Sequence, residues 1–407
     1  MGVYTDFFEE KIYDVLVEED YIGELKKVMG QFRPFHEALD SFLLEHGYRG
    51  NIEDTDEKVK FISEKCRQAG VPVPRNLRKW YSENKRIERM SAVPFQLCFA
   101  FELNEGKANE FLHKVCLGRG FDCHLMEEIV YYFALKNRFT YAETQEILAK
   151  VQLVKPGKIQ GENFVYTKYI VEELEEIETA EELIAYLNEN AGQFGYNNGT
   201  ACRTIQSLWR EISGYGEKEG IAKREKSCMY SVWDRDGEET EEKNEHKSTD
   251  DSIWKIYLQI LGLSTEYLGK LPKDRSLKPI LKDNALLHPL AEEAFPDRDG
   301  ITKILNGEHV SYERIRKLLI LLSFYQYYGN LAAEKRTFDA GQEDEEKCIL
   351  NIENVLSDAN YPPLYPGNPY DFLILMAIRS EIPLTTFRDY MRDLYFEKQN
   401  EDASEKD

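Results

Sequence analysis

Apolar residues recur at helical spacing through most of the 407-residue chain, and this pattern constrains the fold more than any other feature. In residues 312–325, for example, Ile315, Leu318, Leu319 and Leu322 are three or four positions apart, which places them on one face of a helix. No stretch alternates apolar and polar residues for long enough to predict a sheet. The sequence therefore predicts an all-α fold built from many helices.

Residues that begin helices occur at the borders of several periodic segments. Asp54 precedes a segment that continues to a glycine at position 70, and its side chain is suited to accept from the first helical amides. Thr179 is followed three residues later by Glu182, which is the capping-box pattern. Asn368 and Pro369 supply a cap and a proline at the first helical position. These signals predict three helix starts.

Two stretches share one order of elements. Residues 301–305 form a short apolar segment that ends at Asn306-Gly307, and Ser311 then precedes the long apolar segment. Residues 77–82 form another short segment, followed by a polar turn, Ser91 as the expected cap and a second apolar segment. This order resembles the second half of a repressor-type helix-turn-helix domain, and the resemblance covers residues 57–103 and 288–328.

The resemblance implies that each short helix enters the major groove of DNA while nearby bases contact phosphates. Residues 77–82 and 301–306 take the recognition-helix positions. The residues expected to contact DNA are Arg75, Arg78, Lys79, Lys85, Arg86, Arg89, Thr302, Lys303, Arg314, Arg316 and Lys317. The chain departs from the family pattern at Pro72, Pro74 and Pro296, which crowd the start of the two stretches.

The local charge of the two stretches also favours DNA contacts. Residues 72–90 carry six bases against two acids, and residues 298–317 carry five bases against three acids. The whole chain has a net charge of −22, and such a field repels phosphate unless the bases are gathered on one face. The alternative is that these segments are solvated helix faces which keep the helix-turn-helix shape without binding DNA.

An internal repeat is a further hypothesis. Residues 124–147 align without gaps against residues 367–390 at an offset of 243, and Ala134 and Ala377 are the identical pair. Any two amphipathic helices share an apolar pattern, so the alignment alone leaves both duplication and coincidence open.

Composition predicts the domain organisation. We expect an N-terminal helical module over 1–150, a helical connector over 151–233 and a C-terminal helical module over 252–397. Residues 234–251 carry nine acids against three bases and no large apolar residue, which predicts a disordered acidic loop between them. Residues 398–407 form a charged tail.

Seven cysteines without a repeated spacing favour a reducing compartment over a disulfide framework. No apolar run approaches the roughly 20 residues of a membrane span, and the N-terminus lacks the basic start and apolar core of a signal peptide. We therefore expect a cytoplasmic protein that does not enter a membrane.

Motifs for catalysis are absent from the sequence. It contains no GxxxxGK[ST], GxGxxG after a strand, HExxH or GxSxG pattern, and it implies no cofactor. His113, Cys116, Cys123 and His124 offer two imidazoles and two thiols, but their spacing is not that of a zinc finger, and buried thiols are common in helices. We expect neither a metal site nor an enzyme.

Three functional hypotheses follow. The first is a regulatory protein that binds duplex DNA through helix-turn-helix-like modules and controls transcription. The second is a protein-protein interaction scaffold or oligomer, with a basic partner drawn by the acidic field. The third is a cryptic metal-dependent nuclease built from scattered Asp, Glu and Lys side chains.

Overall fold

The computed structural model shows an all-α protein with many helices, as the sequence predicts. It describes residues 35–83, 91–116, 120–154, 167–195, 199–226 apart from 216–217, 249–263, 298–308, 312–334 and 342–392, with short pieces at 7–8, 10–12, 27–28, 87, 118 and 310. The strands in these ranges are β1 (Gly214–Tyr215) and β2 (Lys218–Glu219), an antiparallel pair in which Gly214 faces Glu219.

The chain divides into two compact units. Unit 1 comprises residues 1–31, 201–357 and 363–407, and unit 2 comprises residues 32–200 and 358–362. The border at 200 divides the predicted connector of residues 151–233, so that its first part packs with the N-terminal helices. Thr249, Asp250 and Asp251, the end of the predicted acidic loop, are the first residues of helix α14. The rest of that loop and the charged tail lie outside the described residues.

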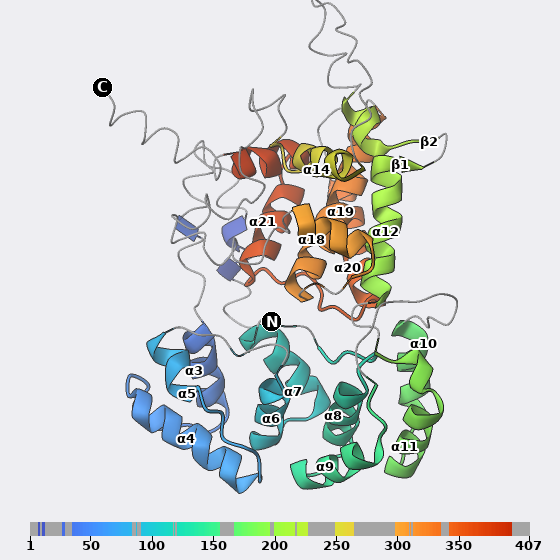
Figure 1. The fold of residues 1–407 in the computed structure, drawn as a ribbon. Coiled ribbons are helices and arrows are strands. Elements are labelled where there is room, and N and C mark those ends of the chain that lie inside the picture. Colours follow the sequence, from blue (N-terminus) through green and yellow to red (C-terminus); the bar gives the residue numbers. More distant parts are fainter. Residues whose placement is uncertain are drawn as a thin grey trace, which may run out of the picture. The chain divides into compact units, whose positions relative to one another are not determined.

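Unit 2 is an array of short helices (Figure 1). The elements are α3 (Phe35–Glu45), α4 (Thr55–Gln68), α5 (Leu77–Ser82), α6 (Val93–Ala100), α7 (Glu105–Glu110), the π-helical turn η1 (Phe111–Val115), α8 (Met126–Lys136), α9 (Tyr141–Lys150), α10 (Thr167–Glu175), α11 (Ala180–Glu189) and the 3-10 turn η3 (Ala191–Gln193). Helix α12 (Gly199–Ser213) begins at the border and continues into unit 1.

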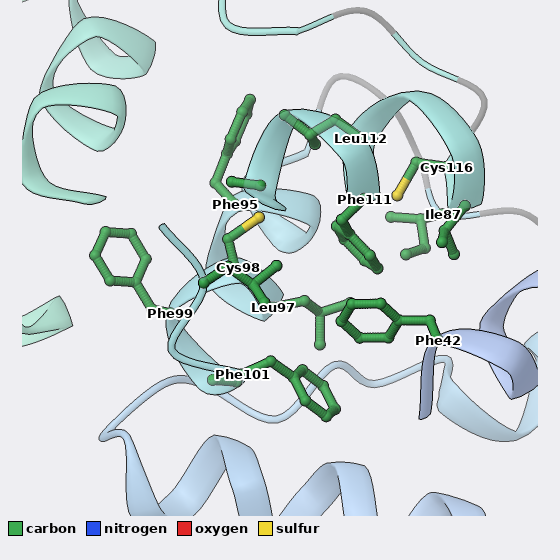
Figure 2. Close-up of a cluster of buried hydrophobic side chains, with 14 of the residues drawn as sticks. Phe42, Ile87, Phe95, Leu97, Cys98, Phe99, Phe101, Phe111, Leu112 and Cys116 are labelled. Carbon is green, nitrogen blue, oxygen red and sulfur yellow. The ribbon is translucent and has the colours of Figure 1, made fainter. Parts of the chain in front are cut away.

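Aromatic side chains fill the core between α3, α6 and η1. Phe42 of α3 lies between two of them, with its ring centroid 4.6 Å from that of Phe111 and 5.0 Å from that of Phe101 (Figure 2). Cys98 and Cys116 are buried in the same cluster. A second cluster joins α8 and α9 to α10 and α11 through buried aliphatic residues that include Ile147, Leu174 and Leu183. These two cores hold the helices of unit 2 together.

Unit 1 contains the longest helix of the described chain, α19 (Tyr312–Ala333). Further helices of unit 1 are α14 (Thr249–Ile260), α18 (Arg298–Leu305), α20 (Gln342–Asp358) and α21 (Pro369–Ile378), and residues 221–226 and 383–392 are also helical. Figure 1 shows α18 to α21 gathered together. All ten residues of α21 are buried, because neighbouring elements cover it on every side.

The predicted helix starts are largely confirmed. Asp54 accepts from the amides of Asp56 and Glu57, Thr179 and Glu182 form a capping box, and Asn368 caps α21. The predicted Ser91 cap is wrong, because α6 begins after residue 92 and has a proline in its first turn, where one amide needs no acceptor. Ser311 lies outside the described residues.

Candidate functional site

The first predicted DNA surface lies at α5. Arg75, Arg78 and Lys79 are exposed there. Arg78 forms an ion pair with Asp56, and Lys79 Nζ lies 3.7 Å from Glu83 Oε1. Exposed pairs of this kind contribute little stability, so neither prevents these cations from meeting another anion. Three predicted contacts therefore reach solvent at one short helix, two of them beside an acid.

The second predicted surface is different. Lys303 is exposed on α18, and Thr302 and Arg314 are half-buried. Arg316 and Lys317, in contrast, are buried with 4% and 5% of their surface exposed. They lie on α19 at positions covered by other helices, so they are not part of a surface that DNA reaches. The hypothesis of DNA contacts at these two residues is corrected accordingly.

A buried carboxylate explains the position of Arg316. Its Nη1 and Nη2 atoms each donate to an oxygen of Asp371 on α21, at 2.7 Å in both cases. The same carboxylate accepts from the amide of Tyr365 at 2.9 Å. The guanidinium is thus used inside unit 1, as a planar two-pronged partner for an acid that is fully buried.

The remaining predicted contacts, Lys85, Arg86 and Arg89, lie outside the described residues. Residues 77–82 and 301–305 form the expected short helices, and Gly307 has the positive φ of 69° that the Asn-Gly turn requires. The short helices and the turn were therefore predictable from sequence. Whether they act as recognition helices stays a prediction.

A surface that the sequence analysis did not single out lies on α10, on α11 and on the turn between them. Residues 171–190 contain eight acids and no base, and all eight are exposed. They are Glu172, Glu173, Glu175, Glu176, Glu178, Glu181, Glu182 and Glu189. We call this set the acidic face. The sequence carries this signal as a run of acids with no base between them. The helical spacing of the apolar residues in the same segment led us to interpret it as a connector.

Packing holds the two helices of the acidic face together. Leu174 of α10 and Leu183 and Leu187 of α11 belong to one buried cluster. Tyr186 Oη donates to Glu173 Oε2 at 2.6 Å and so links the helices at their surface. Figure 1 shows α10 and α11 side by side. The glutamates are consequently carried on two linked helices and the turn between them, which keeps like charges close together and creates a local negative potential.

Unit 2 also contains a hollow of about 180 Å³. Its lining residues are Asn109, Phe121, Asp122, Cys123, Ile129, Tyr132, Val171, Leu174, Glu175 and Asn360. Burial lowers the pKa of the neighbouring His124 imidazole to about 4, so this ring is neutral at pH 7. Within the described residues, no group of three or more His, Cys, Asp or Glu side chains is arranged to hold a metal ion.

No family model, curated protein or solved structure matches the chain. In the ranges given above, no helix is both long enough and apolar enough to cross a membrane.

Proposed function

We propose that the protein acts without catalysis, as an interaction module that binds a basic segment of another protein on the acidic face of α10 and α11. The observation that supports this is the set of eight exposed glutamates in residues 171–190, with no base among them. A lysine- or arginine-rich segment is the chemical complement of such a surface, and the net charge of −22 steers cations toward the molecule as a whole.

The two-helix geometry favours a protein partner over a single metal cation. Carboxylates that bind a metal converge on one point, whereas three of these glutamates lie on α10, two in the connecting turn and three on α11, and no three of them are arranged to hold an ion. An extended basic segment, with several charges spaced along it, matches such a distribution. Glu182 remains engaged in its capping box and Glu173 accepts from Tyr186, so the other six glutamates are the expected contacts.

The test compares two triple variants with the same change in charge. Glu172→Gln, Glu176→Gln and Glu181→Gln remove three charges from the acidic face, while Glu53→Gln, Glu64→Gln and Glu146→Gln remove three exposed charges elsewhere on unit 2. Binding of a fluorescent arginine- and lysine-rich peptide is measured by anisotropy. If each charge contributes about 0.3 kcal/mol, the first variant binds about fivefold more weakly. Equal affinities for the two triple variants contradict the proposal.

Duplex DNA binding by α5 is a second candidate, supported by the exposure of Arg75, Arg78 and Lys79 at one short helix. The expected result is an affinity for random duplex DNA that falls linearly with the logarithm of salt concentration. The double variant Arg75→Gln and Lys79→Gln reduces the slope, while Lys60→Gln and Arg67→Gln on the exposed side of α4 leave it unchanged. Equal slopes for both double variants contradict DNA binding at α5.

A further inference from the structure

We infer that residues 105–150 and 348–392 are two copies of one helical module, in which Glu128 and Asp371 are equivalent positioning residues. This inference does not depend on the proposed function. It rests on where helices end and begin, on two buried acids and on two hydrogen bonds, and each of these bonds joins residues of a single unit.

The helix borders agree with a single offset. Helix η1 ends at Val115 and α20 ends at Asp358, which are 243 positions apart. Helices α8 and α21 begin at Met126 and Pro369, again 243 positions apart. The following helices begin at Tyr141 and Pro383, which agree with the same offset to within one residue. The loop before α8 and the loop before α21 therefore have the same length.

A buried acid occupies the same place in both copies. Glu128 is the third residue of α8 and Asp371 is the third residue of α21, and both are buried. Each accepts a hydrogen bond from the backbone amide six residues earlier: Asp122 N donates to Glu128 Oε2 at 2.8 Å, and Tyr365 N donates to Asp371 Oδ2 at 2.9 Å. In both modules the carboxylate fastens the preceding loop onto the first turn of the helix.

This shared bond separates duplication from coincidence. Two unrelated amphipathic helices share an apolar pattern because both bury one face. Burial of a carboxylate is costly, and nothing in that pattern requires an acid in the first turn with a loop amide six residues before it. Ala134 and Ala377, which are both fully buried, fall at the same offset deeper in the helices. A common origin for the two modules accounts for all of these matches together.

The copies have diverged around the acid. Arg316 pairs with Asp371 in unit 1, and the capping box of Thr140 and Glu143 in unit 2 aligns with Pro383 and Thr386. The two modules therefore retain the loop length, the buried acid and the hydrogen bond that this acid accepts from the loop amide. Their common origin also predicts that a residue of one module that contacts a binding partner has an equivalent residue 243 positions away in the other module.

Hydrogen exchange on the full chain tests the equivalence. Peptides that cover residues 121–126 and 364–369 report the two loops. In Glu128→Ala and Asp371→Ala, the loop of the altered module loses its acceptor and exchanges at least about tenfold faster. In Glu128→Asp and Asp371→Glu, where each module receives the acid of the other, loop protection stays within about threefold of the natural chain. Glu127→Ala, an exposed acid on α8, is the control and leaves exchange unchanged.

Two outcomes overturn the inference. One is an alanine variant that accelerates its loop in only one of the two modules, because the acids then have different roles. The other is an exchanged acid that exposes its loop as strongly as alanine does. If an alanine variant unfolds its whole unit, the paired Asp and Glu exchanges decide the question, since both keep an acceptor for the loop amide and Asp371→Glu also keeps a charge for Arg316.

Discussion

At the scale of single residues, unit 1 depends on charges that are buried in pairs. Glu225 accepts from Arg388 Nη1 at 2.7 Å and from Arg388 Nη2 at 3.1 Å, and it also accepts from Tyr325 and Gln259. Burial acts to raise the pKa of this carboxyl, but the arginine and the hydrogen bonds outweigh burial and lower the pKa. The pair is thus stable only as a complete set of partners.

We expect Glu225→Gln to lower the free energy of unfolding of unit 1 by about 3–5 kcal/mol at pH 7, because Arg388 keeps a buried charge without its counterion. Glu219→Gln is the matched control, since Glu219 pairs with Lys223 at an exposed site. Its effect stays within about 1 kcal/mol. Urea denaturation measures both variants. Equal losses for the two glutamates contradict the prediction.

The same carboxyl predicts a dependence on pH. A lowered pKa in the folded state gives stability that is fully present above the unfolded pKa of about 4.3 and is lost as pH falls through the folded value. The difference in unfolding free energy between the natural chain and Glu225→Gln should therefore narrow as pH is lowered below about 4. A difference that stays constant down to pH 2 rules out this contribution.

At the scale of elements, the end of α14 requires glycine. Gly262 has a φ of 70°, and a Cβ atom built there lies 2.6 Å from Arg388 Cβ. Gly70 has a similar φ of 67° with nothing within 4 Å of such an atom. Gly70→Ala should cost about 1 kcal/mol from backbone strain alone, and Gly262→Ala about 1–3 kcal/mol more from the clash. Thermal unfolding of both variants measures the difference. If the two variants lose equal unfolding free energy, the contact between the new Cβ atom at position 262 and Arg388 is relieved by local movement.

Local signals in the sequence were enough to predict where several helices begin or end. The caps at Asp54, Thr179 and Asn368 and the turn at Gly307 all depend on residues within one turn of the helix border. The burial of Arg316 could not be predicted in the same way, because its partner Asp371 lies 55 residues further along the chain. A count of local charge assumes that every basic side chain is exposed to solvent. It therefore placed Arg316 on a surface.

The acidic face shows a second feature that local sequence patterns could not predict. The run of glutamates in residues 171–190 is visible in the sequence, and the structure buries its apolar residues Leu174 and Leu183. The sequence did not show that α10 and α11 pack against each other and so unite their outer faces. The shared acidic face arises only from that tertiary contact, which is why helical spacing alone indicated a connector.

At the scale of the whole molecule, the two compact units each have their own aromatic core. Phe42 contacts Phe101 and Phe111 in unit 2, and Phe324 contacts Tyr328 and Phe387 in unit 1. A unit with its own buried core is expected to unfold cooperatively by itself. Because the chain is expected to contain two such cooperative regions, a single free energy of unfolding would describe neither of them.

We therefore expect calorimetry of the full chain to resolve two transitions, each tied to one core. Phe42→Ala and Phe324→Ala remove the same side chain from different units, and each should lower the unfolding free energy of its own unit by about 3–5 kcal/mol. The first variant should shift one transition to lower temperature and leave the other in place, and the second should do the reverse. If either variant shifts both transitions together, the units unfold as one cooperative body. Independent transitions would also allow a loss of peptide binding in an acidic-face variant to be checked against the folding of unit 2 alone.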